Sequence, residues 1–294
     1  MKKKNASGIE ILKYKMLLVG MVNVLVLSAL SGIQGAGYLG ISLMVLTLLV
    51  SFHSVWVSDM VARYIRGRNA RNQYRSSLKF FRGALLYISV TGILPGVVLV
   101  LCSDLLGSFL IRDIHISICL MILAALLPAY GISEVFSGYL RGMGFYMPVK
   151  LFYVVRQATS FVGSIAGMKF LGEYGKKVAN LKHNEAVTSV YDAFGALLGI
   201  AAGCILGIVL LLAFCVILRG ELRAMRSKDN ARYQESASHG FRVMISMGFL
   251  YGFRCLLLFA PLPVNYILYV RLCKSGGDSA PWIRTGGYLF GEAI

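Results

Sequence analysis

Long apolar runs, separated by short polar stretches, make up most of the sequence. A helix needs roughly 20 apolar residues to cross a bilayer, because its backbone polar groups must all be satisfied within the segment. Seven runs reach this length, and an eighth begins near Trp282. The seven runs cover residues 16–33, 38–61, 84–111, 114–140, 148–171, 190–218 and 243–270. This pattern predicts an all-α fold, a polytopic membrane helix bundle.

Glycine and proline mark two of the short connections between runs. Gly35, Gly37 and Gly40 have the G-x-G-x-x-G spacing that marks a dinucleotide site when a β-strand precedes it. Here two membrane runs flank the motif, so we predict a tight turn between helices instead. A second connection, around Gly144, precedes Pro148, whose missing N–H suits the first turn of a helix.

The composition agrees with a membrane protein and sets its orientation. Hydrophobic residues make up 57% of the chain and charged residues 15%, whereas charged residues are about a quarter of a soluble domain. The net charge of +17 would suggest nucleic-acid binding in a soluble protein, but the cations concentrate beside alternate apolar runs, as the positive-inside rule describes. We therefore predict no nucleic-acid partner and a multi-pass protein among the lipids of the cell inner (plasma) membrane, with its N-terminus in the cytoplasm.

The first apolar run has a second interpretation. Its basic start, together with the small residues Ser28 and Ala29, also fits a cleaved signal peptide. The further spans and the charge asymmetry favour a first membrane helix. The basic stretch from Arg63 to Arg82 likewise has two interpretations, an amphipathic segment on the anionic inner leaflet or a loop that only fixes topology.

A polar, basic stretch divides the chain into two unequal parts. We predict a six-helix lobe over residues 1–218, a cytoplasmic linker over 219–242, and the first helices of an incomplete second lobe over 243–294. Within the sixth run, four glycines recur at intervals of four and share one helical face: Gly195, Gly199, Gly203 and Gly207. This small-xxx-small pattern is typical of close packing between membrane helices.

No catalytic motif stands out in the sequence. The four histidines lie in different segments, and the six cysteines are scattered without a C-x-x-C pair. We therefore predict no enzyme activity, no metal site and no cofactor.

Ionisable residues inside the apolar runs are the candidates for function. A charge at mid-bilayer costs about 2.5 to 3.5 kcal/mol on insertion scales, so it usually faces protein or a water-filled cavity. We predict that Arg254 and Arg156, with the adjacent Gln157, line a substrate cavity. A structural pair with a carboxylate, or a misplaced span boundary, is the alternative. Glu134 and Asp59 are candidates for ion coupling, with solvation at helix ends as the simpler account.

Two stretches carry a resemblance to a known family. They are SGYLRGMGFYMPVKLFYVVRQ at 137–157 and VARYIRGRNARNQYR at 61–75. The chain resembles flippases of the multidrug/oligosaccharidyl-lipid/polysaccharide exporter superfamily, and is most similar to the polysaccharide biosynthesis and stage V sporulation protein B-like branch. The resemblance implies two six-helix lobes around a cationic cavity. It also implies outward movement of polyprenyl-pyrophosphate-linked glycans by alternating access.

The chain departs from the family pattern in two ways. It supplies one lobe and the opening of a second, so we expect a truncated flippase that needs a second lobe or a second copy. Arg156 stands where family members often carry a glutamate, which favours an anionic lipid-linked glycan. Three alternatives stay open: a cation-coupled multidrug exporter of the same superfamily, a non-transporting membrane scaffold that docks through the glycine face, and a membrane glycosyltransferase.

Overall fold

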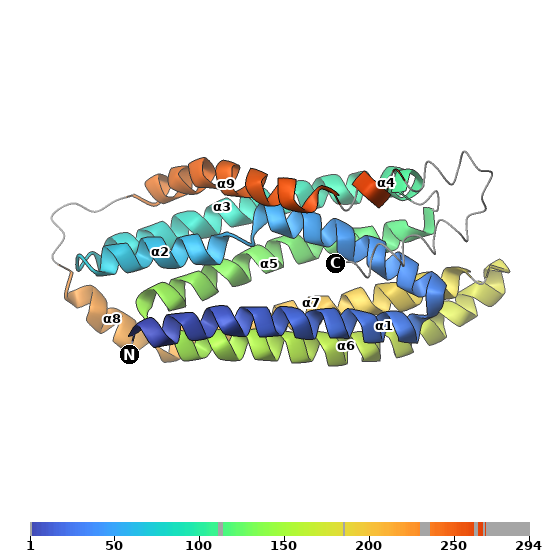
Figure 1. Cartoon of the computed structure of the whole chain (residues 1–294), viewed down its shortest axis with the longest axis horizontal. Coiled ribbons are helices and arrows are strands. Elements are labelled where there is room, and N and C mark those ends of the chain that lie inside the picture. Colours follow the sequence, from blue (N-terminus) through green and yellow to red (C-terminus); the bar gives the residue numbers. More distant parts are fainter. Residues whose placement is uncertain are drawn as a thin grey trace.

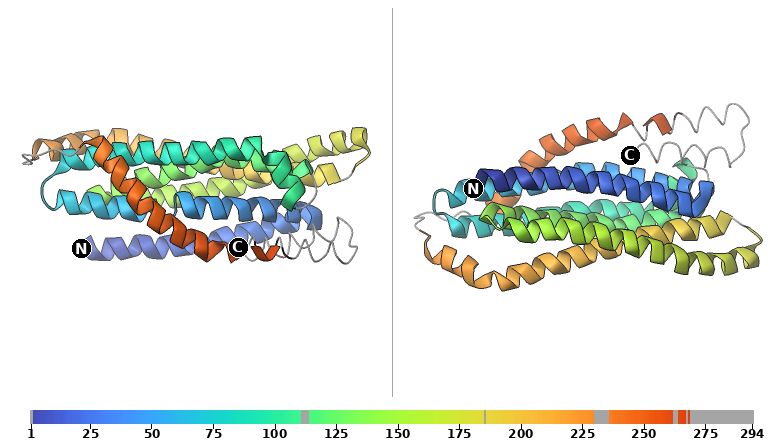
Figure 2. Two further views of the ribbon diagram at one scale, coloured as in Figure 1. Left: turned by 90° about the horizontal axis from the view of Figure 1, so that it is seen from above. Right: turned by 60° about the horizontal axis from the view of Figure 1, so that its bottom comes forward.

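The computed structural model of the protein describes residues 2–110, 114–184, 186–229, 236–261, 264–266 and 268. The described residues form helices and their connections, with no strand among them, so the predicted all-α membrane bundle is confirmed. The long helices run roughly side by side in an elongated bundle (Figure 1; Figure 2). The helices are α1 (Lys2–His53), α2 (Val57–Asn69), α3 (Tyr74–Leu101), α4 (Ser103–Leu110), α5 (Ser117–Met143), α6 (Tyr146–Lys182), α7 (Ala186–Ile217), α8 (Arg219–Ser227) and α9 (Ala237–Phe259).

The helix α1 contains a reversal of chain direction at Gly32. The backbone there has φ 69° and ψ 172°, a conformation that is essentially restricted to glycine. The two halves of α1 run back along each other (Figure 1), as the first two apolar runs predicted. The reversal precedes the G-x-G-x-x-G motif, whose glycines are helical, so the motif itself is not the turn.

Several helix boundaries differ from those predicted. The second run is interrupted at residues 54–56, where α1 ends before α2, and the third run is divided at Cys102 between α3 and α4. The polar stretch between the fifth and sixth predicted runs, residues 172–189, is mostly helix, because α6 continues to Lys182 and α7 begins at Ala186. The predicted linker over 219–242 contains α8 and the first turns of α9. A polar sequence therefore does not mark a loop here, since these stretches still form exposed helical turns.

Five helical segments of the described chain are long and apolar enough to cross a membrane: Leu18–Asn69, Tyr74–Leu101, Ser117–Met143, Ala186–Ile217 and Ala237–Leu258. The first of them takes in α1 from Leu18 onwards, on both sides of the Gly32 reversal, together with α2. The fifth predicted run lies in α6, which is not among the five. Its 37 residues would extend about 55 Å, longer than the hydrocarbon core, and polar residues occupy its middle.

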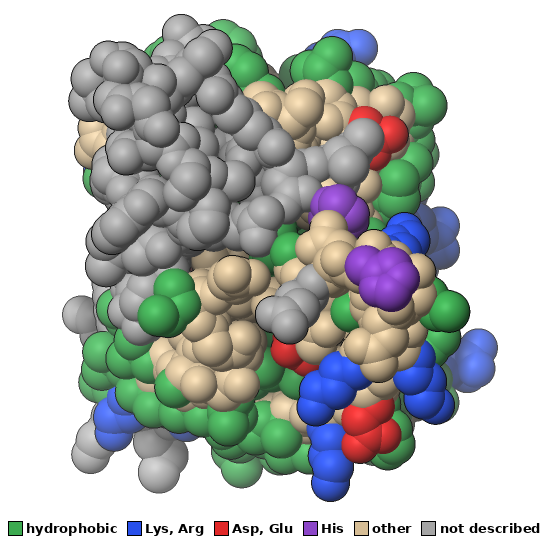
Figure 3. Space-filling model, turned by 90° about the vertical axis from the view of Figure 1, so that its right-hand side faces the viewer, with side chains coloured by type: hydrophobic (Ala, Val, Ile, Leu, Met, Phe, Trp, Pro, Cys, Tyr) green, Lys and Arg blue, Asp and Glu red, His purple; other side chains and the backbone are tan. Residues whose placement is uncertain are grey.

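The connections between helices alternate between the two ends of the bundle. The N-terminus, the α2–α3 connection, the α5–α6 connection and α8 share one end, whereas the Gly32 reversal and the α6–α7 connection lie at the other (Figure 1). At this second end, charged and histidine side chains gather over part of the face, with hydrophobic side chains around the edge (Figure 3). This arrangement is the one that a membrane-spanning bundle requires.

The connection between α5 and α6 is short and is capped by glycine. Gly144 has φ 98°, and its N–H bonds the carbonyl oxygen of Arg141 while the next N–H bonds that of Leu140. This left-handed cap ends α5. Pro148 lies in the first turn of α6, as predicted. The two helices therefore return antiparallel through a tight turn.

The helices α6 and α7 form the most extensive contact in the bundle. All four glycines of the α7 face lie along it. A Cβ at Gly199 would collide with the backbone of Gly163 and Ser164, and one at Gly195 would collide with Gly167. The absence of side chains on both helices allows this approach.

The helix α9 packs against α3 and against α1. Gly240 lies at the backbone of Phe80 on α3, and Gly252 lies at Phe52 on α1. The first helix of the predicted second part is therefore packed on the predicted first lobe.

Candidate functional site

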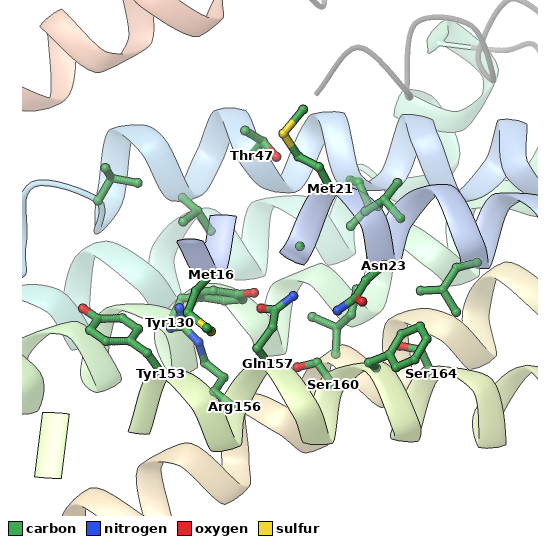
Figure 4. A pocket seen from close by; sticks show the side chains of 18 of the residues that line it. Met16, Met21, Asn23, Thr47, Tyr130, Tyr153, Arg156, Gln157, Ser160 and Ser164 are labelled. Carbon is green, nitrogen blue, oxygen red and sulfur yellow. The ribbon is translucent and has the colours of Figure 1, made fainter. Parts of the chain in front are cut away.

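A cavity of about 450 Å³ lies between the two halves of α1 and the helices α5, α6 and α7 (Figure 4). Its size is within the range of small-molecule sites. Apolar side chains contribute much of the lining, but a set of polar side chains lies in it too: Asn23, Thr47, Ser54, Tyr130, Glu134, Tyr153, Arg156, Gln157, Ser160 and Ser164. Most of these polar groups come from α5 and α6, the helices that the Gly144 turn joins.

Arg156 is the charged centre of this lining. Its Nη1 lies 3.4 Å from Oε1 of Glu134, and the two side chains are only 17% and 11% exposed. Three aromatic rings surround the guanidinium, with Cζ 4.9 to 5.3 Å from the ring centroids of Tyr130, Phe152 and Tyr153. This distance is in the range of cation–π attraction. The rings and the carboxylate together hold a cation where bare hydrocarbon would reject it.

Glu134 has a second partner across the same contact. The Tyr153 hydroxyl donates to its Oε2 over 3.2 Å. Because one carboxylate oxygen accepts from Arg156 and the other from Tyr153, both oxygens are satisfied on the α6 side. The carboxylate is therefore held by two α6 side chains one turn apart.

Gln157 projects from α6 towards α1 (Figure 4). A Cβ added at Gly20 of α1 would lie 3.3 Å from its Nε2, so the absence of a side chain at Gly20 leaves room for the amide. Asn23 lies one turn further along α1 and lines the same cavity. Two side-chain amides thus face the cavity beside the guanidinium.

Arg254 lies elsewhere. It is exposed near the C-terminal end of α9, and it does not line the cavity that Arg156 and Gln157 share. The reason is that α9 packs on α3 and α1, not on α6. Of the three residues predicted to line one cavity, Arg156 and Gln157 do so and Arg254 does not. A cavity role for Arg254 therefore rests on the sequence alone.

The two ion-coupling candidates also have different environments. Glu134 is buried and paired, which departs from simple solvation at a helix end. Asp59 is in the first turn of α2 with its side chain 48% exposed, and it forms an ion pair with Arg141, which is 7% exposed. Arg141 also donates to the carbonyl oxygen of Ser58 over 2.9 Å. Asp59 is thus partly exposed at the surface of the bundle, whereas Glu134 lies in its interior.

Sequence analysis missed four residues that shape the site: three line the cavity, and the fourth, Phe152, packs against Arg156. Asn23 had a visible signal, since it is a polar residue within an apolar run. Tyr130, Phe152 and Tyr153 had none, because aromatic residues are ordinary in membrane helices, and only their packing around Arg156 distinguishes them.

No cluster of three or more His, Cys, Asp and Glu side chains that could hold a metal ion occurs within the described residues. Comparison with protein-family models, with curated proteins and with solved structures finds no match. The family resemblance stays a prediction from the sequence.

Proposed function

We propose that the protein takes part in moving an amphiphile with an anionic head group, a polyprenyl-pyrophosphate-linked oligosaccharide, across the cell inner membrane by alternating access. The proposal rests chiefly on Arg156, a buried cation at a cavity with several polar side chains, between helices whose outer faces are apolar. Its remaining N–H donors suit a pyrophosphate, because a guanidinium presents five donors in a planar fork and Glu134 accepts one described bond.

The rest of the cavity supports the same substrate class. The amides of Asn23 and Gln157 and the hydroxyl of Ser160 offer the neutral hydrogen bonds that a sugar needs. A lipid tail could stay in the bilayer along the apolar helix faces. The N-terminus would be cytoplasmic, which places the basic α2–α3 and α8 segments at the anionic inner leaflet. A second lobe or a second copy of the chain would complete the pathway.

The test is translocation of a fluorescent polyprenyl-pyrophosphate disaccharide in vesicles that contain the protein, with Arg156→Gln as the variant. We expect transport to fall on the order of a hundredfold, because a buried charge pair to the head group is lost. Arg223→Gln, an exposed cation of α8 that does not line the cavity, is the control and should transport like the unmodified chain. The proposal fails if Arg156→Gln transports normally while remaining folded.

A cation-coupled exporter of drug-like cations is the second candidate. Glu134 together with Tyr130 and Tyr153 is also a set that attracts cations. In that case a cationic dye, and not the anionic lipid, would be the transported species, and Glu134→Gln would abolish its transport. Arg156 argues against this candidate, because its charge repels a cation in the same cavity.

A further inference from the structure

A chain of buried hydroxyl groups connects the cavity to the Asp59 end of α2. Tyr153 Oη donates to Glu134 over 3.2 Å and lies 3.3 Å from Ser137 Oγ. Ser137 Oγ in turn lies 2.9 Å from Ser58 Oγ. Ser58 is the residue before Asp59, and all three hydroxyl-bearing residues are buried. Three helices, α2, α5 and α6, thus contribute one continuous polar path through an apolar interior.

Neither packing nor helix capping requires this path. A serine in a membrane helix usually bonds a carbonyl oxygen of its own helix, as Ser133 does with Tyr130 over 2.7 Å. Ser58 and Ser137 bond each other across the α2–α5 contact instead. Close approach makes this possible, since a Cβ at Gly138 would lie 2.7 Å from the carbonyl oxygen of Ser58.

We infer that Ser58, Ser137 and Tyr153 form a proton pathway to Glu134, and that protonation of Glu134 frees Arg156 to bind the anionic head group. The inference rests on the proposed function and adds its coupling ion. In the transfer, the Tyr153 O–H bond breaks as the Glu134 O–H bond forms. Ser137 returns a proton to Tyr153, Ser58 returns one to Ser137, and a hydronium ion at the Asp59 end supplies Ser58 and is left as water. The hydroxyls end unchanged and Glu134 gains one proton.

The charge change explains the coupling. With Glu134 ionised, the Glu134–Arg156 pair has no net charge, so an anion binds Arg156 only weakly. With Glu134 protonated, the guanidinium carries an uncompensated positive charge beside the cavity, so anion affinity rises as pH falls. By linkage, a bound anion raises proton affinity by the same factor.

The other titratable groups around Glu134 leave this assignment intact. From α6 they are Tyr153 and Arg156, and from α5 itself Tyr130, which lies beside Cys204 of α7. His53, at the end of α1, faces Gly92 and Gly131 and bonds Thr91. Beyond the hydroxyl chain, Asp59 of α2 is paired with Arg141 of α5. Glu134 is the carboxylate among the cavity-lining residues.

The first test measures equilibrium binding of sulfate, a soluble anion that does not titrate in the range used, to the purified full chain. We expect sulfate affinity to rise about tenfold as the pH is lowered. Glu134→Gln should bind with an affinity independent of pH, and Arg156→Gln should not bind. A pH-independent affinity in the unmodified chain would overturn the inference. Retained binding by Arg156→Gln would instead overturn the proposed function.

The second test isolates the pathway from the site. After a drop in pH, time-resolved infrared spectroscopy follows the carboxylic acid band that Glu134→Gln lacks. Ser137→Ala and Tyr153→Phe should slow its rise severalfold without changing its final size. The matched controls are Ser133→Ala, a buried serine on the same helix, and Tyr139→Phe, a buried tyrosine outside the chain.

Equal rates in all variants would overturn the pathway, because Glu134 would then take its proton directly from the cavity. Slowing in the controls as well would also overturn it. If Tyr153→Phe does not fold, Ser58→Ala provides the same comparison, since it removes only one oxygen at the far end of the chain.

Discussion

Two faces of α6 use opposite means to hold neighbouring helices. Towards α7 the helix presents Gly163, Gly167 and Ser164, and the backbones meet directly. Towards α5 it presents Tyr153 and Arg156, which bind a carboxylate. The first contact depends on the absence of side chains and the second on particular polar atoms. We therefore expect the glycine face to be intolerant of volume and the polar face to be intolerant of unpaired charge.

The largest effect should follow from adding volume to the contact between the glycine faces of α6 and α7. In Gly199→Leu the side chain has no space, because even a Cβ would collide with Gly163 and Ser164. Overpacking usually costs about 1 to 3 kcal/mol, and here the contacted atoms are backbone, so we expect no folded protein at all. Size-exclusion chromatography of the detergent extract measures this outcome.

The control is Gly220→Leu on α8, where no atom lies within 4 Å of an added Cβ. It should leave the elution profile unchanged. A normal profile for Gly199→Leu would mean that α6 and α7 separate easily, and the contrast between the two faces would disappear. The scaffold alternative docks through these same glycines, and in the structure that face is already occupied by α6.

The next effect concerns the ion pair on the other face. Glu134→Leu leaves Arg156 buried without its carboxylate, which should lower the free energy of unfolding by about 3 kcal/mol. Unfolding in mixed detergent micelles with increasing SDS measures the loss.

The double variant Glu134→Leu with Arg156→Leu sharpens this prediction. It should recover most of the lost stability, because two apolar side chains replace a pair whose desolvation is costly. If the double variant is as unstable as the single one, the pair is itself stabilising and its retention needs no functional explanation. Recovery of stability with loss of transport would assign the pair to function.

The difference between the faces also explains what sequence could predict. The glycine face was visible because a spacing of four residues fixes one side of a helix, whatever the partner. The sequence could also predict that the two members of the ion pair lie at the same depth in the bundle. Glu134 lies ten residues before Gly144 and Arg156 twelve after it, so an antiparallel turn brings them level. The sequence could not predict how each helix is rotated about its own axis, and so which side faces which neighbour, because the apolar runs have little amphipathic pattern.

Arg254 shows the cost of that missing information. Its position inside an apolar run resembles that of Arg156, and both were predicted to line one cavity. Only the packing of α9 on α3 and α1 separates them. Extension of helix through polar stretches, as in α6 beyond residue 171, was missed for a related reason, since sequence polarity reports solvent contact and not helix ends.

The smallest effect tests a polar contact on the glycine face. Ser164 donates to the carbonyl oxygen of Ala196 on α7 over 2.7 Å. Ser164→Ala should cost about 1 kcal/mol in the same SDS titration, the usual value of a buried hydrogen bond. Ser133→Ala, whose hydroxyl bonds within its own helix, should cost less than about 0.5 kcal/mol. A loss at Ser164 as large as that of Glu134→Leu would show that the two faces of α6 are held alike, by polar atoms, and that the glycines serve mainly to bring this donor within reach.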